Sequence, residues 1–127
     1  MSDNVMASSA DSVACTVEAG LARITLTQAA RGNPLDLAFS REMRAVAIEL
    51  ANRDDVRAVL ITAQGRFFSV GGDINMFLPD RSAIPGIARR ITADLHTAIS
   101  RFQRMDAPVV TAVQGVSPGG RLARRPV

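Results

Sequence analysis

Two pairs of adjacent glycines are the residues of this chain best placed to do chemistry. The pair at 71–72 comes after the apolar run 56–62, and the pair at 119–120 comes after the apolar run 109–113. Glycine lets a bound group approach the backbone closely, because it has no side chain in the way. Backbone N–H groups at the start of a helix lack partners inside it and attract negative charge. Two such turns on neighbouring strands could aim two N–H groups at one oxygen atom, as an oxyanion hole does.

Phosphate binding is another use of glycine-rich turns, but the nucleotide fingerprints are missing. Neither G-x-x-x-x-G-K-[ST] nor G-x-G-x-x-G occurs, and every one of the fifteen basic residues is Arg, so the chain has no phosphate-binding Lys. Ordinary connecting turns remain the alternative to an oxyanion hole. The repetition of an apolar strand followed by a Gly-Gly turn favours the hole.

The rest of the chain supplies the elements that would position these turns. Strands alternate with helices in the predicted order, which is typical of an α/β fold with a mainly parallel sheet. In such sheets ligands bind beyond the carboxyl ends of the strands, where both glycine turns lie. Pro79 and Pro85 are expected to bracket a loop. Hydrophobic periodicity predicts strands at 13–17, 21–27, 56–62 and 109–113 and helices over 36–51 and 87–102.

Composition and charge exclude several other classes of protein. The 127 residues, 47% of them hydrophobic, suffice for one ordered domain. The net charge of +3 equals the contribution of Arg121, Arg124 and Arg125, so no basic face for nucleic acid or a membrane surface is expected. Single Cys15 and His96 residues make neither a disulfide framework nor a zinc site. Without a signal peptide or membrane span, we expect a cytoplasmic protein.

Three segments, in order, resemble the signatures of the enoyl-CoA hydratase/isomerase (crotonase) family. GLARITLTQAARGNPLDLAF resembles the family's opening strand and N-A-L segment, and GRFFSVGGDINMF resembles its G-x-x-F-x-A-G-x-D-I/L signature. APVVTAVQGVSPGG resembles its P-V-I-A-A-V-x-G-x-A-x-G-G-G signature. The resemblance covers residues 13–120 and implies a crotonase-like ββα spiral fold, present here as its N-terminal portion. It also implies an acyl-CoA thioester partner, with coenzyme A as part of the substrate and no separate cofactor.

The same resemblance assigns roles to residues of the two turns. The backbone N–H groups of Val70 and Gly120 would be the two oxyanion donors, holding the enolate that forms from the thioester carbonyl. Asp73 is equally well explained as an acidic residue at a helix N-terminus. The remaining positions would contact the acyl-pantetheine or the nucleotide of coenzyme A: Asn33, Leu35, Gly71, Gly72, Asp73 and Ile74.

The chain departs from the family pattern after Gly120. Arg121 replaces the family's third glycine. The family's first catalytic carboxylate lies three residues after the second donor, where this chain has Ala123, and its second would lie beyond Val127. Because general acid–base catalysis needs a positioned carboxylate or His, we expect a truncated family member that is inactive alone. An acyl-CoA-binding fragment without catalysis and a non-functional remnant are the alternatives.

These departures predict an incomplete domain. We expect a flexible N-terminus (1–11), a crotonase-like portion (12–120) and an aberrant Arg-rich tail (121–127). Apolar faces and a sheet edge should be left uncovered. The homotrimer or hexamer of the full-length family is not expected of this chain.

Other groups inside the chain are poor substitutes for the missing acids. His96 lies beside the buried stripe of its helix and is expected at the surface or in a structural role. Glu18, Glu42 and Glu49 are expected to be solvated. A Clp-type serine protease places a Ser near the second turn, but no His or Asp follows Ser117 to complete such a site.

Overall fold

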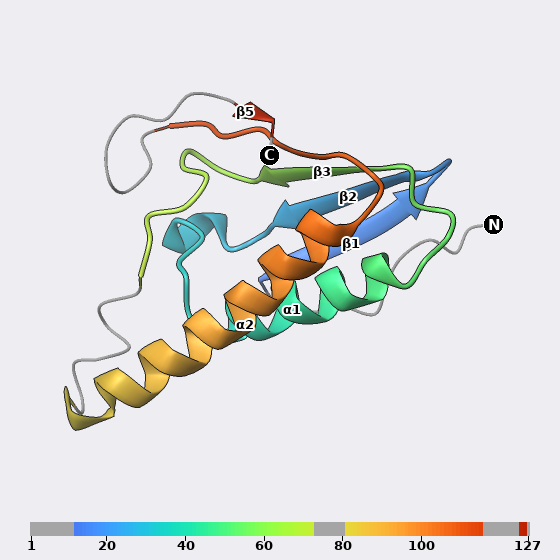
Figure 1. The fold of residues 1–127 in the computed structure, drawn as a ribbon. Coiled ribbons are helices and arrows are strands. Elements are labelled where there is room, and N and C mark those ends of the chain that lie inside the picture. Colours follow the sequence, from blue (N-terminus) through green and yellow to red (C-terminus); the bar gives the residue numbers. More distant parts are fainter. Residues whose placement is uncertain (1–11, 73–80, 116–124, 127) are drawn as a thin grey trace.

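The computed structural model describes residues 12–72, 81–115 and 125–126. In this part of the chain, one mixed β-sheet carries two long helices on one of its faces (Figure 1). The strands lie in the order β1-β2-β3-β4-β5. They are β1 (Val13–Glu18), β2 (Leu21–Leu26), β3 (Ala58–Ala63), β4 (Val109–Thr111) and β5 (Arg125–Pro126). The helices are α1 (Leu37–Ala51) and α2 (Ile84–Arg104), with short 3-10 helices η1 (Ala29–Arg31) and η3 (Arg81–Ala83).

β1 and β2 form the expected hairpin. They pair antiparallel with Glu18 opposite Leu21, so two residues make the loop. Both loop residues have positive φ, 53° at Ala19 and 85° at Gly20, which matches the twist that two-residue hairpins require. Alternate residues of both strands face the helices and are buried, as period-2 patterning dictates: Val13, Cys15, Val17, Ala22, Ile24 and Leu26.

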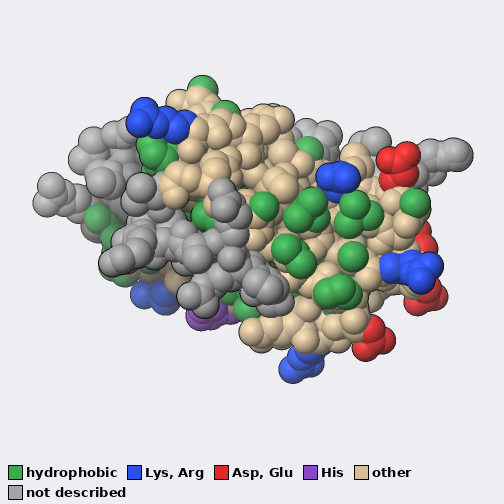
Figure 2. All heavy atoms as spheres, turned by 90° about the horizontal axis from the view of Figure 1, so that it is seen from above, with side chains coloured by type: hydrophobic (Ala, Val, Ile, Leu, Met, Phe, Trp, Pro, Cys, Tyr) green, Lys and Arg blue, Asp and Glu red, His purple; other side chains and the backbone are tan. Residues whose placement is uncertain are grey.

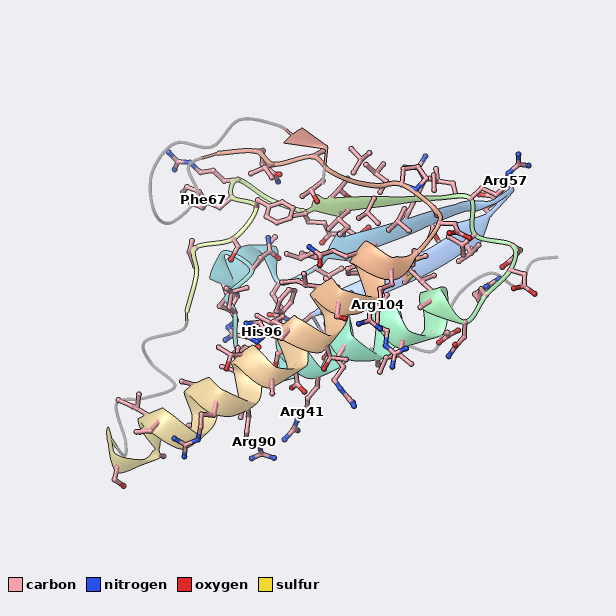
Figure 3. The ribbon with its side chains drawn as sticks, in the orientation of Figure 1. Arg41, Arg57, Phe67, Arg90, His96 and Arg104 are labelled. Carbon is pink, nitrogen blue, oxygen red and sulfur yellow. The ribbon has the colours of Figure 1, made fainter. Side chains whose placement is uncertain are left out.

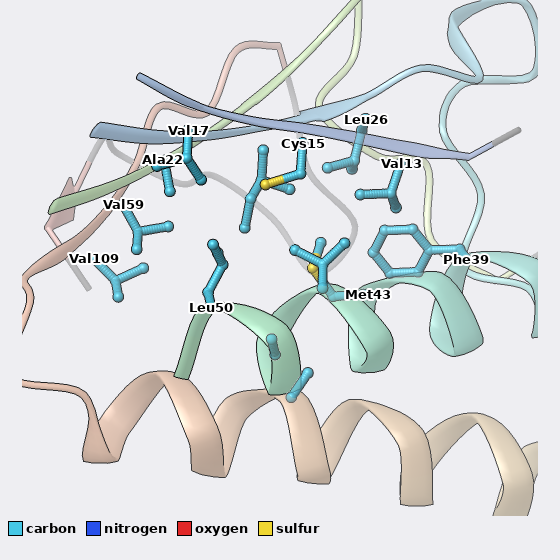
Figure 4. Packing of buried hydrophobic residues seen from close by; sticks show 14 residues of the cluster. Val13, Cys15, Val17, Ala22, Leu26, Phe39, Met43, Leu50, Val59 and Val109 are labelled. Carbon is cyan, nitrogen blue, oxygen red and sulfur yellow. The ribbon is translucent and has the colours of Figure 1, made fainter. Parts of the chain in front are cut away.

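α1 begins where the sequence predicts, because Asp36 caps its N-terminus. The Asp36 carboxylate accepts a hydrogen bond from the Phe39 N–H at 2.9 Å. Its other oxygen lies 3.1 Å from the Arg31 guanidinium, which fixes the entry of the helix. The helix then buries one face against the sheet (Figure 4), through Phe39, Met43, Val46, Ala47 and Leu50.

α2 starts earlier than the sequence predicts. The helix begins at Ile84, so Pro85 lies in its first turn rather than in a loop. Proline is tolerated there because the first N–H groups of a helix have no intrahelical partner. α2 packs on the outer side of α1 (Figure 4), where Ser40 donates a hydrogen bond of 3.0 Å to Asp94. Asp94 also lies 3.9 Å from the Arg44 guanidinium.

β3 and β4 continue the sheet in parallel with β2. Val59 lies opposite Val109 and Ile61 opposite Thr111, so both strands end at the same edge. The expected parallel α/β arrangement is therefore confirmed. The segments that follow β3 and β4 leave the sheet side by side, and they are the two glycine turns. Below, the first glycine turn means residues 64–72 and the second glycine turn means residues 114–120.

Apolar surface is left open, as the sequence predicts. Ile99 on α2 is 50% exposed and Val110 on β4 is 42% exposed. Figure 2 shows hydrophobic side chains gathered on the face seen from above. A cavity of about 590 Å³ opens between the helices and the sheet; Phe68, Ile61 and Phe102 are among its apolar lining residues. Among the described residues, no helix combines the length and apolar character needed to cross a bilayer.

The expectation that Glu42 is solvated is corrected. Its carboxylate accepts hydrogen bonds from the N–H groups of Ser12 and Val13, at 2.8 and 2.9 Å. This contact closes the start of β1 and joins it to α1.

Residues 125–126 of the Arg-rich tail form β5, which pairs antiparallel with β4. Such backbone pairing needs no hydrophobic pattern. The division of the chain at residues 11 and 120 stays a prediction.

Candidate functional site

The first glycine turn and the start of the second lie against each other. The Phe68 N–H donates to the Gln114 carbonyl oxygen at 3.2 Å. The Gln114 side-chain amide donates in return to the carbonyl oxygens of Ala63 and Gly65, at 2.7 and 3.0 Å. Figure 3 places Phe67 at the carboxyl end of β3, whereas Arg57 lies at the opposite end of the sheet. The described parts of the two turns thus meet where ligands bind in α/β sheets.

Close contact between the turns depends on a glycine. Gly115 has a φ of 73°, and a Cβ atom there would lie 2.8 Å from the carbonyl oxygen of Arg66. Any other residue would therefore be strained and would push the turns apart. On the solvent side, the Arg66 guanidinium lies 5.2 Å from the centre of the Phe67 ring, a cation–π contact that holds the arginine on the turn.

The loop 28–35 supports the first glycine turn from the other side. The Asn33 amide donates to the carbonyl oxygens of Gln64 and Phe67, each at 3.0 Å. Asn33 is 2% exposed, and its φ of 52° lies in the left-handed region that Asn tolerates. Its side chain therefore faces the protein and not solvent. The contact of Asn33 with the acyl-pantetheine stays a prediction, and the structure gives its side chain a role in holding the turn.

The Val70 N–H is already engaged. It donates to the Gly32 carbonyl oxygen at 2.9 Å, so in this structure it is not available to an oxyanion. The Gly71 N–H is engaged as well, donating to the Ser69 hydroxyl at 3.0 Å. The assignment of Val70 as the first donor is therefore corrected. No feature of the sequence indicated that the Gly32 carbonyl group would accept a hydrogen bond from the Val70 N–H.

The open backbone N–H that the sequence led us to expect at Val70 is found at Gly72 instead. It is exposed, and its N–H has no hydrogen-bond partner among the described residues. Its backbone is held in place by a parallel bridge to Leu35, whose N–H donates to the Gly71 carbonyl at 2.7 Å. A Cβ atom at Gly72 would meet nothing within 4 Å. The two glycines therefore differ: Gly71 is needed for its φ of 91°, while Gly72 leaves an open approach to its N–H.

The other predicted binding residues fall into two groups. Leu35 is half-buried and packs against the hydrophobic core, and Gly71 is buried. Leu35 also supports the turn from the loop 28–35, through the hydrogen bond of its N–H to the Gly71 carbonyl oxygen. Asp73, Ile74 and Gly120 lie outside the described residues, so the second donor and the proposed nucleotide contacts stay predictions.

The described part of the first glycine turn offers backbone donors but contains no Asp, Glu, His or Cys. None of its hydrogen bonds among the described residues involves Asp, Glu, His or Cys. His96 is exposed on α2, as expected. Cys15 is buried under the sheet, and burial, assisted by the negative charge of Glu49, raises the pKa of its thiol to about 11. The described residues hold no group of three side chains suited to a metal ion. The described part of the site therefore presents backbone N–H groups and no carboxylate, imidazole or thiol.

Comparisons with known proteins agree with the three sequence signatures. The family model for enoyl-CoA hydratase/isomerase matches residues 16–123. The 1,2-epoxyphenylacetyl-CoA isomerase of Escherichia coli is 32% identical over 108 residues, which is 81% of this chain and 40% of that protein. The trans-2-decenoyl-[acyl-carrier-protein] isomerase of Streptococcus mutans is 33% identical over 107 residues, again 81% of this chain and 40% of that protein.

Solved structures show the same fold. An enoyl-CoA hydratase/isomerase from Mycobacterium paratuberculosis superposes with a TM-score of 0.71 at 26% identity, covering 84% of this chain and 42% of that one. An enoyl-CoA hydratase from Shewanella pealeana superposes with a TM-score of 0.73 at 24% identity, over 83% of this chain and 40% of that one. The expected crotonase-like α/β fold, in part, is confirmed. The chain spans about 40% of the length of the proteins it matches.

Proposed function

This chain belongs to the enoyl-CoA hydratase/isomerase family, and on that premise we propose that its first glycine turn binds the thioester carbonyl of an acyl-CoA. The Gly72 N–H is the donor on this turn. Gly120 supplies the second donor from the second glycine turn. Together they hold the negative charge that develops on the carbonyl oxygen when the thioester becomes an enolate, the type of stabilisation for which loss of one donor costs about 10²–10³ in rate.

One observation carries the proposal: Gly72 is exposed and its N–H has no partner among the described residues, while the neighbouring N–H groups of Val70 and Gly71 are engaged inside the protein. A backbone donor without a partner at the carboxyl edge of a parallel sheet favours an external acceptor. The surrounding bonds hold the turn in place before the ligand arrives. Such preorganised donors stabilise developing charge well, because they need no reorganisation during the reaction.

We propose binding, rather than turnover, as the activity of this chain by itself. Enolate formation and hydration require a proton to be removed or delivered, and that needs an acid–base group next to the substrate. The described hydrogen bonds of the turn include no such group, and Ala123 stands where the family resemblance places a carboxylate. An oxyanion donor alone polarises the carbonyl and favours the enolate of a substrate that is already acidic.

Acetoacetyl-CoA tests this proposal directly. Its β-keto thioester ionises easily, and its enolate absorbs in the near ultraviolet, so a hole that stabilises the enolate increases that band at constant pH. S-ethyl-CoA is the matched control, because it keeps the whole coenzyme but has a thioether in place of the thioester carbonyl. We expect the purified chain to increase the enolate band and to bind the thioester at least about tenfold more tightly than the thioether. Equal affinities without a change in the band would overturn the proposal.

Hydration of crotonyl-CoA separates binding from catalysis. The loss of the enoyl absorbance reports addition of water across the double bond. We expect no loss above the uncatalysed rate at protein concentrations that saturate the acetoacetyl-CoA signal. Measurable turnover would contradict the proposal that this chain only binds and would require an acid–base group outside the described contacts.

A further inference from the structure

The side-chain amides of Asn33 and Gln114 donate hydrogen bonds to the end of β3 and the first glycine turn from opposite sides. Asn33, from the loop before α1, donates to the carbonyl oxygens of residues 64 and 67. Gln114, from the second glycine turn, donates to the carbonyl oxygens of residues 63 and 65. Four carbonyl groups between 63 and 67 are therefore bound by only two amide nitrogens. This pair of side chains is called the amide clamp below.

The chemistry of a primary amide suits this task. Its nitrogen carries two N–H donors, so one side chain can bind two carbonyl groups of a tight turn at once. Asn33 and Gln114 both use their nitrogen in this way, with donor–acceptor distances between 2.7 and 3.0 Å. These carbonyl groups lie at the end of β3 and just after it, where hydrogen bonding between neighbouring strands ends. The clamp satisfies them and joins three chain segments.

Further hydrogen bonds hold the rest of the first glycine turn as far as Gly71, the residue before Gly72. The Ser69 hydroxyl donates to the Asn33 carbonyl at 2.8 Å and accepts from the Gly71 N–H at 3.0 Å. The Leu35 N–H donates to the Gly71 carbonyl at 2.7 Å. These bonds connect Asn33 and Leu35 to Ser69 and Gly71, and they lead up to Gly72, whose N–H has no partner among the described residues.

Asn33 keeps a feature that a purely structural residue would avoid. Its side-chain oxygen is buried and has no hydrogen-bond partner among the described residues. A buried acceptor without a partner costs free energy, whereas an apolar side chain would avoid that cost. The two donors on its nitrogen are therefore the property that this position uses, and both act on the first glycine turn.

We propose that Asn33 and Gln114 are positioning residues for the Gly72 N–H. Gln114 sets the distance between the two glycine turns, and Asn33 sets the orientation of the first turn relative to the loop 28–35. Both act through the backbone of 63–71 and neither touches the thioester. This inference rests on the proposed function, because it assigns the clamp to the donor that the proposed function uses.

Variants that lack the side-chain amide N–H donors of Gln114 or Asn33 test the amide clamp. Gln114→Met keeps most of the side-chain length without an N–H, and Asn33→Gly removes the amide while tolerating the positive φ. Ser40→Ala is the matched control, because it removes a buried hydrogen bond between α1 and α2 instead. Each variant is titrated with acetoacetyl-CoA and S-ethyl-CoA, and its midpoint of urea unfolding is measured.

If Asn33 and Gln114 are positioning residues, their substitution should weaken the binding of acetoacetyl-CoA but not that of S-ethyl-CoA. For Gln114→Met and Asn33→Gly, we expect the enolate band to fall and acetoacetyl-CoA to bind about tenfold more weakly, while S-ethyl-CoA affinity changes less than about twofold. Ser40→Ala should leave both affinities unchanged. Clamp variants that keep the full enolate band, or that lose both ligands in proportion to their lost stability, would overturn the proposal.

Amide NMR of the chain without ligand keeps the test independent of the proposed function. If the wild-type chain gives no enolate band, the proposed function fails, but the clamp still predicts a shifted or broadened Gly72 amide signal in Gln114→Met. Ser40→Ala should leave that signal in place. If Asn33→Gly does not fold, Gln114→Met alone decides, because Gln114 is only half-buried. An unmoved Gly72 signal in a folded Gln114→Met variant would contradict the clamp.

Discussion

The Val70 N–H donates to the Gly32 carbonyl oxygen across 2.9 Å, and this bond decides which residue of the first glycine turn is free to act. It directs the Val70 amide into the loop 28–35, and since the Gly71 amide is bound to Ser69, Gly72 is the residue among 70–72 whose amide has no partner among the described residues. The same contact places the Val70 side chain against the backbone of Gly32, where a Cβ atom would lie 2.7 Å from a methyl carbon of Val70. Gly32 also has a φ of 77°.

Substitution of Gly32 should therefore be costly. We expect Gly32→Ala to lower the free energy of unfolding by about 1–3 kcal/mol, because alanine is strained at this φ and its methyl group meets Val70. Urea unfolding followed by circular dichroism measures the change. Gly86→Ala is the control: Gly86 lies in α2 with no atom within 4 Å of a built Cβ, so alanine should stabilise the chain by roughly 0.5–1 kcal/mol. A Gly32→Ala variant as stable as wild type would contradict the described turn.

Cys15 should make stability fall at alkaline pH. Burial raises the pKa of its thiol from 9.0 to about 11 in the folded state, so between these values the unfolded chain loses a proton that the folded chain retains. The contribution is complete below pH 9 and is lost as pH rises toward 11, by about 2–3 kcal/mol in total. Urea midpoints at pH 8 and pH 10.5 should show this fall for wild type and a smaller one for Cys15→Ala. Equal falls in both proteins would rule out the thiol as the cause.

The Glu42 carboxylate should contribute to the stability of the first strand. Glu42→Ala leaves the Ser12 and Val13 N–H groups without their acceptor, and we expect a loss of about 1–3 kcal/mol in the free energy of unfolding. Glu42→Gln keeps an oxygen in the same place without the charge and should lose less. Hydrogen exchange at the Val13 amide should quicken in Glu42→Ala. Unchanged exchange there would show that the contact does not protect β1.

The core under the sheet should be far more sensitive than the open side of α2. Leu50 is fully buried against the sheet, so Leu50→Ala should cost about 2–5 kcal/mol of unfolding free energy. Ile99, half-exposed on α2, is the comparison, and Ile99→Ala should cost less than about 1 kcal/mol. Thermal melts of both variants give the difference. Similar losses would mean that α2 is covered in solution by a surface that the described residues do not include.

Sequence periodicity predicted the order and type of the elements well. The strands at 13–17 and 21–27, the helix over 36–51 and the parallel pairing of the strands at 56–62 and 109–113 were all predicted from hydrophobic periodicity and element order, and all are present. The predicted ends of the helices and strands were less accurate at positions where one residue is compatible with two local structures. Pro85 indicates a loop or a helix start equally well, and only the packing of α2 on α1 decides for the helix.

For the candidate site, the sequence indicated chain segments better than individual donors. Two glycine pairs after two parallel strands pointed to the segments that follow β3 and β4, and the described parts of these segments contact each other because both strands end at the same edge of the sheet. Which amide is free depends on non-local bonds, such as Val70 with Gly32 and Asn33 with Phe67, and no local pattern encodes these. The same limit explains Glu42, whose partners lie 29 and 30 residues away in the chain.

The most direct test of the account compares two substitutions at Gly72. Gly72→Ala keeps the N–H and meets no atom within 4 Å, whereas Gly72→Pro removes the N–H at the same position. With both variants shown by circular dichroism to be folded, their acetoacetyl-CoA enolate bands are measured against wild type. We predict that Gly72→Ala retains the band and Gly72→Pro loses it. A Gly72→Pro variant with an undiminished band would contradict the assignment of this N–H as the oxyanion donor.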